Sequence, residues 1–140
     1  MKKKAVITIK SNVSLDEDDL IEVVTPGDFF ITDYGFRVEY DETEVSGMEG
    51  TRTTIIIRDK VFELIREGST ETKMEFEYMK GNVSLYKTPY GVLEMETYTK
   101  KLNIDMNENG GSIATDYTLT LEGQETVKTQ LIVEVKTNKS

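Results

Sequence analysis

The chain contains neither cysteine nor histidine. Without cysteine it forms no disulfide bonds, so its stability rests on packing and backbone hydrogen bonds. Without either residue it has no zinc site of the usual Cys/His type, no catalytic thiol and no Ser-His-Asp triad. Any catalysis would depend on carboxylates, lysine, tyrosine or hydroxyl groups, and no paired-carboxylate motif stands out. We therefore expect a protein that is not an enzyme and that uses no cofactor.

Long hydrophobic runs are also missing, since the apolar runs are no longer than Ile55–Ile57. A membrane-spanning helix needs about 20 apolar residues, and a secretory signal needs an apolar stretch of about 7–15 residues. Neither follows the basic start Met1–Lys4. The 17 basic and 26 acidic residues give a net charge of −9, which would repel a phosphate backbone. We expect a cytoplasmic protein that binds neither membranes nor nucleic acid.

What the chain does have is a regular alternation of inward-type and outward-type residues, which is typical of half-buried strands. The clearest run is Ile113–Leu121, where Ile113, Thr115, Tyr117 and Leu119 alternate with Ala114, Asp116, Thr118 and Thr120. The 140 residues are close to the size of one ordinary domain of roughly 100–150 residues. Because no linker or repeat interrupts the pattern, residues 1–140 are predicted to form a single domain.

Glycine-containing turns separate the strand-like runs. Thr25–Asp28, with Pro26 and Gly27 at its centre, has the composition of a tight turn. The segment 59–66 fits helical spacing as well as strand spacing, and we assign it to a strand because strand-like runs flank it closely. The predicted strands cover 4–11, 18–25, 28–34, 36–43, 52–59, 61–67, 70–79, 82–87, 91–107 (bent or broken near Tyr98), 111–122 and 124–137.

So many consecutive strands with short links indicate a meander. An open sheet of this size would leave long edges exposed, whereas closure removes them. The sequence therefore predicts an all-β fold, an antiparallel up-and-down β-barrel of about 8–10 strands. A two-sheet sandwich is the structural alternative.

One segment matches a metal-binding pattern. Asp105–Gly110, followed by Asp116, has the spacing of a calcium loop, with aspartate in place of the final glutamate. An EF-hand loop joins two helices, however, and here strand-like alternation lies on both sides. We interpret the segment as the tip of a β-hairpin and predict no metal site.

Several separated motifs carry a family resemblance. The segments Val45–Thr54 (VSGMEGTRTT) and Ser84–Gly91 (SLYKTPYG), with Ile65–Gly68 and Met74–Phe76 between them, resemble the YwiB-like family of small bacterial β-barrel proteins, a domain of unknown function. The resemblance covers nearly the whole chain, including Ile9–Ser11. It implies a lipocalin-like, or calycin-type, barrel in a bacterial protein. It implies no established activity and carries over no catalytic residue.

Arg66 is the leading candidate for a ligand contact, because it shares strand parity with Phe62 and Leu64. On an inward face its guanidinium needs an acidic partner or a bound anion. The alternative places Arg66 at the barrel mouth, where it pairs with a structural carboxylate or extends into water. Tyrosines near Thr88–Gly91 combine an apolar body with a polar tip, which suits a ligand mouth. The candidate ligand-binding residues are Arg66, Tyr40, Arg52, Tyr86, Tyr90 and Tyr98.

The leading functional hypothesis is a barrel that binds a small amphipathic or anionic ligand in its lumen. The alternative is a filled barrel that serves as a protein-interaction or structural domain, as a homodimer, with no small ligand. A carboxylate-based enzyme ranks last. An interior cavity of about 300 Å³ or more, lined by converging polar groups, would favour the first hypothesis, and a filled lumen would favour the second.

Overall fold

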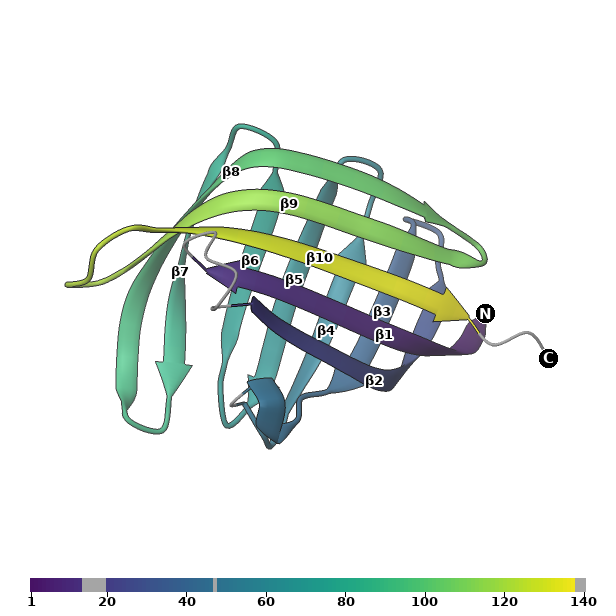
Figure 1. Ribbon diagram of the computed structural model, residues 1–140, viewed down its shortest axis with the longest axis horizontal. Coiled ribbons are helices and arrows are strands. Elements are labelled where there is room, and N and C mark those ends of the chain that lie inside the picture. Colours follow the sequence, from purple (N-terminus) through teal and green to yellow (C-terminus); the bar gives the residue numbers. More distant parts are fainter. Residues whose placement is uncertain (14–19, 47, 138–140) are drawn as a thin grey trace.

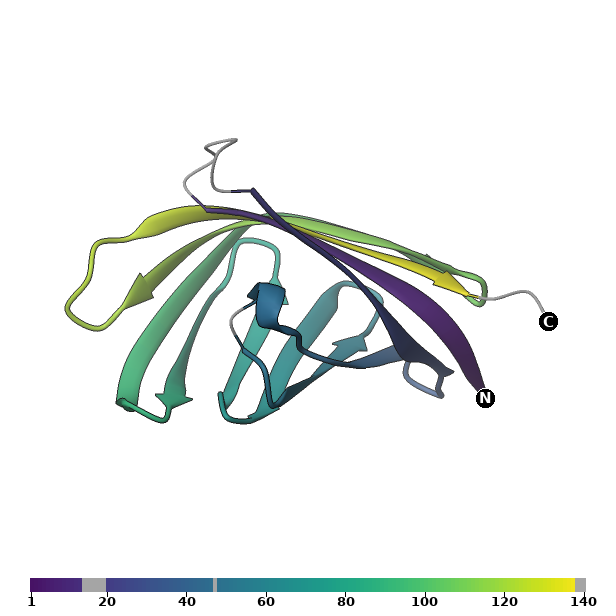
Figure 2. The same ribbon diagram turned by 60° about the horizontal axis from the view of Figure 1, so that its bottom comes forward.

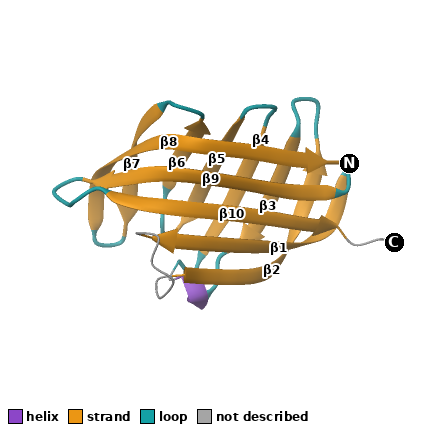
Figure 3. Ribbon diagram, turned by 45° about the horizontal axis from the view of Figure 1, so that its top comes forward, coloured by secondary structure: helices purple, strands orange, loops and turns teal. Residues whose placement is uncertain are grey.

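The computed structural model describes residues 1–13, 20–46 and 48–137. Apart from the 3-10 turn η2 (Glu44–Ser46), which lies next to the start of β2 (Figure 3), the elements of this part of the chain are β-strands. The strands are β1 (Lys2–Val13), β2 (Leu20–Ile31), β3 (Phe36–Asp41), β4 (Thr51–Ile57), β5 (Val61–Gly68), β6 (Thr72–Glu77), β7 (Gly81–Thr88), β8 (Gly91–Asn107), β9 (Gly110–Leu121) and β10 (Val127–Thr137).

All ten strands belong to one antiparallel sheet, in the order β6-β5-β4-β3-β2-β1-β10-β9-β8-β7. The first and last strands pair at its centre, where Ile7 lies opposite Val135 and Ile9 opposite Val133. The sheet curls on itself, so that β3–β6 cross behind β1, β2, β9 and β10 (Figure 1), and the turned view shows the curvature from its open side (Figure 2). The prediction of an all-β antiparallel barrel is confirmed.

The barrel is nearly closed, and its seam lies between β6 and β7. At one end of the seam Glu71 and Lys87 exchange two backbone hydrogen bonds of 2.8 Å each. At the other end the amide of Lys80 donates to the carbonyl of Glu77 across the connecting turn, at 3.1 Å. Among the described residues, no ladder joins the two strands between these points. The β6–β7 seam is therefore closed at both ends and unpaired along its middle.

The predicted turn at Thr25–Asp28 is wrong. The predicted strands 18–25 and 28–34 are one bent strand, β2, which pairs with β1 through the pairs Val6–Pro26 and Ala5–Gly27. A Cβ atom on Gly27 would lie 2.7 Å from the carbonyl oxygen of Glu39 and 2.9 Å from Cγ1 of Ile7. This glycine therefore lets two neighbouring strands approach closely where β2 bends, rather than reversing the chain.

Two other features of the sequence-based assignment are confirmed. The ambiguous segment 59–66 belongs largely to strand β5. The irregularity expected near Tyr98 is a register shift between Thr99 and Lys101, where β8 pairs with β9.

Candidate functional site

The inner face of β3–β6 changes from apolar to polar along the barrel. Strand register sets its side chains in successive cross-strand rows. The first two rows are apolar and the third is polar: Phe36, Ile57, Phe62 and Phe76; then Val38, Ile55, Leu64 and Met74; then Tyr40, Thr53, Arg66 and Thr72. At the apolar end the rings of Phe62 and Phe76 stack with centroids 4.5 Å apart. One end of the barrel is thus a packed core, and the other carries the polar groups.

Arg66 faces a buried carboxylate at the polar end. Its Nε lies 3.8 Å from Oε2 of Glu42, and the two side chains are 19% and 4% exposed. The same Oε2 accepts a hydrogen bond from the hydroxyl of Thr53, the cross-strand neighbour of Arg66. The Nε of Arg66 is buried and has no hydrogen-bond partner within the described residues. Glu42 is therefore held by Thr53, and the Nε of Arg66 faces its carboxylate without forming a hydrogen bond.

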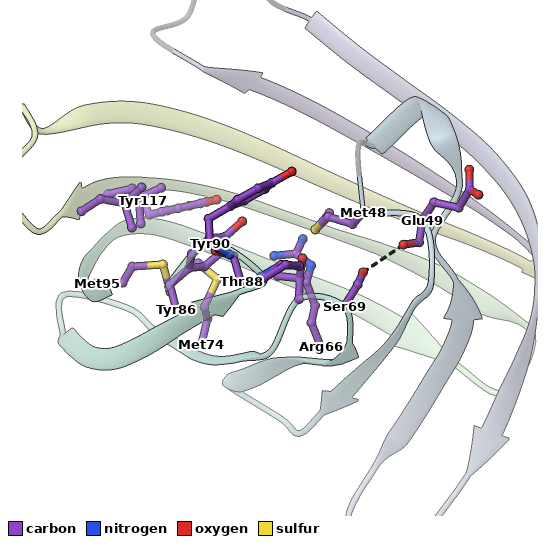
Figure 4. A pocket seen from close by; sticks show the side chains of 14 residues that line it. Met48, Glu49, Arg66, Ser69, Met74, Tyr86, Thr88, Tyr90, Met95 and Tyr117 are labelled. Atoms are coloured by element: carbon purple, nitrogen blue, oxygen red, sulfur yellow. Dashed lines mark hydrogen bonds between the residues drawn. The ribbon is translucent and has the colours of Figure 1, made fainter. Parts of the chain in front are cut away.

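A cavity of about 680 Å³ opens beside Arg66. Figure 4 shows the Arg66 side chain rising into it, with Tyr86, Met74 and Met95 on one side and Met48 on the other. Arg66 is the one cation among the described residues that line this cavity. A smaller cavity of about 130 Å³ lies next to it and is also lined by Tyr40 and Glu42. The two cavities share four lining residues, Met48, Arg66, Met74 and Tyr117. The polar end of the barrel is thus hollow around a single guanidinium.

Two buried tyrosines in this region have raised pKa values. Burial raises the pKa of Tyr40, and the neighbouring carboxylate of Glu42 raises it further, while the Arg66 cation lowers it. Burial likewise raises the pKa of Tyr117, against a lowering by the Arg66 cation. The ring of Tyr117 also meets Phe76 edge-on, with centroids 5.0 Å apart. Both phenols therefore stay protonated at neutral pH. Their side chains lie between the packed core and the cavities.

The structure brings four of the six candidate residues to this end of the barrel. Arg66, Tyr86 and Tyr90 line the larger cavity. Tyr90 does so from the rim, where its side chain is 99% exposed, whereas Tyr86 lies on the inner face of β7. Tyr40 is buried next to Arg66 and lines the smaller cavity. These four residues come from β3, β5, β7 and the β7–β8 turn.

The other two candidates lie on the outer surface. Arg52 forms ion pairs there with Asp41, Glu39 and Asp28, at 3.0, 3.2 and 3.8 Å. Tyr98 points outward from β8, and its hydroxyl donates to the sulfur of Met79 at 3.7 Å. Each sits between inward-facing threonines on its strand, so its own side chain faces away from the lumen.

Sequence reasoning missed Glu42, Thr53 and the three methionines that line the cavity, Met48, Met74 and Met95. A signal for Glu42 was present, because the alternation that puts Val38 and Tyr40 inside continues to residue 42. Nothing local marks Thr53 as the partner of that carboxylate, since the two residues are brought together by the β3–β4 pairing.

The fold and the cavity define a small antiparallel β-barrel protein that is packed at one end and hollow at the other. The chain belongs to the family described as a domain of unknown function (DUF1934), whose model matches residues 7–133. Over 120 residues it is 24% identical to the uncharacterized beta-barrel protein YwiB of Bacillus subtilis (strain 168), a match that covers 84% of this chain and 83% of that protein. The resemblance to the YwiB-like family is confirmed.

The crystal structure of the YwiB protein from Bacillus subtilis has the same fold. It matches with a TM-score of 0.85 and 18% identity, over 99% of this chain and 94% of that one. At this identity the match bears on the fold alone. Within the described residues, no helix is long and apolar enough to cross a membrane, and no group of three or more carboxylates is placed to hold a metal ion.

Proposed function

We propose that the protein binds one small ligand with an apolar body and an anionic head inside the hollow end of the barrel, with the head at Arg66. One observation carries the proposal: a guanidinium on a side chain that is 19% exposed, whose buried Nε makes no hydrogen bond within the described residues, lines a cavity of about 680 Å³. Pockets for small ligands span about 300–1,000 Å³ and combine apolar walls with a few polar groups. Methionine, leucine and tyrosine side chains supply such walls here.

The same proposal makes the protein a cytoplasmic binding protein rather than an enzyme. Glu42, the one buried carboxylate in the part of the chain that the structure describes, is engaged by Thr53 and by the nearby Arg66. A general base must lie within hydrogen-bond reach of the proton that it removes, and Glu42 does not line the larger cavity. This carboxylate acts instead as a fixed counter-charge.

The test is the affinity for 1-anilinonaphthalene-8-sulfonate, an anion with an apolar body whose fluorescence reports binding. We expect Arg66→Met to weaken binding by about 10- to 100-fold, since a hydrogen bond to a charged group contributes about 1.5–3 kcal/mol. Arg52→Met makes the same change on the outer surface and should leave the affinity unchanged. Unaltered binding by Arg66→Met would refute the proposal.

Arg66→Met also leaves Glu42 without its cation, so the variant loses stability for a reason unrelated to a ligand. The double variant Arg66→Met/Glu42→Gln removes both charges and restores the balance. It should regain the melting temperature of the wild type and still fail to bind the probe. Recovery of binding in the double variant would show that Arg66 does not hold the probe.

A second candidate function is self-association, and the outer face of β7 favours it. On this strand the apolar side chains point outward, and Val83 and Leu85 are 64% and 53% exposed beside Val92 at 55%. Lys87 and Glu94 flank this row, so opposite charges can meet across a two-fold axis. The occupant we propose is a second copy of the chain.

Light scattering after size exclusion tests this second candidate. The wild type should be a dimer, and Val83→Ser should make it a monomer. Val24→Ser, at a valine that is 61% exposed on β2, is the matched control and should stay dimeric. A monomeric wild-type protein would refute self-association through β7.

A further inference from the structure

We infer that Glu42 restricts the ligand to a head group with a single negative charge, such as a carboxylate, and excludes a doubly charged phosphate. The inference rests on the proposed function, because it concerns the same site. It makes Glu42 a residue that determines specificity without supplying the attraction itself.

The first step is the charge present before any ligand enters. Arg66 and Glu42 lie 3.8 Å apart and together carry no net charge. Glu49 also lines the cavity, but Figure 4 shows its carboxylate pointing away, and its backbone carbonyl accepts a hydrogen bond from Ser69. The described lining offers no second cation. A bound anion therefore finds one guanidinium, whose charge is already shared.

The second step is the position of Glu42. Its side chain is only 4% exposed, and the hydroxyl of Thr53 donates to the oxygen that faces Arg66. A carboxylate fixed in this way, in the lining of the smaller cavity, stays beside Arg66 when an anion enters the larger cavity. A head group at Arg66 therefore lies near this carboxylate in a region of low dielectric, where repulsion between like charges is stronger than in water.

The third step compares two heads. A carboxylate brings one charge, and the fork of Arg66 can donate to both of its oxygens. A phosphate monoester above its second pKa brings nearly two charges. The second charge meets no counter-charge in the described lining and is repelled by Glu42. The pair thus selects by charge number rather than by size.

The experiment uses dodecanoate and dodecyl phosphate, which share one chain length, as competitors of 1-anilinonaphthalene-8-sulfonate at pH 8, below their micelle concentrations. For the wild-type protein we expect dodecanoate to compete at least about tenfold better, because one uncompensated charge distinguishes the two heads. Glu42→Gln keeps an oxygen that accepts from Thr53 and removes the charge. It should raise the affinity for dodecyl phosphate by about tenfold, so that the two competitors bind with similar affinities.

Glu49→Gln is the matched control, since it removes the same charge from a carboxylate that points away from Arg66. It should shift the ratio of the two affinities by less than about threefold, as expected for a screened, exposed charge. Equal competition by both compounds in the wild type, with a ratio that Glu42→Gln does not move, would overturn the inference and leave the proposed function standing. If neither compound competes, or if dodecanol competes as well as dodecanoate, the anionic anchor itself fails and the inference fails with it.

Discussion

Tyr40 places a phenol in the dry, charged interior of the barrel, and this has a consequence for stability in alkali. In the unfolded chain a tyrosine ionises near pH 10, whereas burial and the Glu42 carboxylate raise the pKa of Tyr40 in the folded protein. Above about pH 10 the unfolded state therefore releases a proton that the folded state retains, so stability falls as the pH rises. Each tyrosine whose pKa is raised in this way lowers the free energy of unfolding by about 0.8 kcal/mol at pH 10.5.

Tyr40→Phe should remove this part of the alkaline loss. The measurement is the urea midpoint at pH 8 and at pH 10.5, and the difference between the two should be smaller in the variant than in the wild type. Tyr117 shifts in the same direction, so part of the loss remains. Tyr90→Phe alters a side chain that is 99% exposed and should behave as the wild type. An unchanged difference in Tyr40→Phe would contradict the prediction.

At the level of single residues, strand parity predicted the inward position of Arg66, whereas the grouping of tyrosines near Thr88–Gly91 wrongly suggested an inward Tyr98. Tyr98 has the same parity as Leu102, Ile104 and Met106. The register shift between Thr99 and Lys101 changes the phase, so that odd-numbered residues face inward before it. For Arg52 the run Ile55–Ile57 hides the phase, because isoleucine occupies both faces of β4. Parity is reliable only within an uninterrupted ladder.

Among the elements, β2 needs a glycine at its bend. A Cβ atom on Gly27 would come within 2.7 Å of the Glu39 carbonyl oxygen and 2.9 Å of Ile7. Gly27→Ala should therefore destabilise the protein by about 1–3 kcal/mol, as overpacking does, which urea unfolding would measure. Gly81→Ala is the matched control, since the nearest atom to its new Cβ lies 3.4 Å away. A Gly27→Ala variant as stable as the control would show that the bend does not need glycine.

The misread turn at Pro26-Gly27 has a physical explanation. The same two residues that favour a tight turn also suit a bend in a strand that has a neighbour on one side. The β2–β3 pairs extend only as far as Asp28 and Glu39, so Pro26 lies beyond this ladder and β2 is paired there with β1 alone. Local composition does not distinguish the two outcomes, because the decision depends on the close packing of Ile7 against β2.

The β8–β9 hairpin makes a prediction about calcium. Asp105 pairs with Ser112 near the tip, whereas Asp116 lies farther along β9, 4.0 Å from the Lys101 ammonium. The oxygens of an EF-hand must converge on one ion, and an extended ladder keeps these two apart. Calcium added to chelator-treated protein should not change its melting temperature. A saturable rise that Asp105→Ala abolishes would prove this wrong.

On the scale of the whole molecule, the seam is a stretch of the barrel wall in which two adjacent strands share no ladder. Between Glu71–Lys87 and the turn at Lys80, β7 has a ladder partner only on the β8 side. Alternate amides of residues 82–86 should therefore exchange with deuterium faster than those of 131–135 in β10, which is paired on both sides. Residue-resolved exchange by NMR measures this. Equal protection of the two sets of amides would mean that β6 and β7 are hydrogen-bonded to each other in solution.

The alternation of residues and the lack of linkers were sufficient to predict an antiparallel meander that curls into a barrel. Strands can be recognised from local residue types, and their number then favours a barrel over an open sheet. The position of the seam was not predictable, because β6 and β7 look like any other hairpin in the sequence. Their failure to pair is a property of the curled sheet. The cavity follows from that geometry, so its methionine lining could not be read from strand patterns alone.

The seam leads to a final prediction, on circular permutation. Because Ala5 pairs with Thr137, β1 begins where the adjacent strand β10 ends, and a flexible linker of about six residues can join these two strand ends. Opening the chain between Met79 and Lys80 then gives a protein whose strand order in the sheet equals its order in the sequence. The cut also falls beside Met79, whose φ of 62° is unfavourable for a residue with a side chain.

The control permutant carries the same linker and is opened between Glu108 and Asn109, where a tight turn closes the β8–β9 ladder that runs from Asn107–Gly110 to Met95–Leu121. We expect the seam permutant to lose about 1 kcal/mol or less, because no continuous ladder depends on the β6–β7 turn. The control should lose about 2 kcal/mol or more, since its two long strands must then find each other without local closure. Urea unfolding of both permutants decides the matter. If the seam permutant is the less stable of the two, the β6–β7 connection holds the barrel together and the seam is a structural joint rather than an opening.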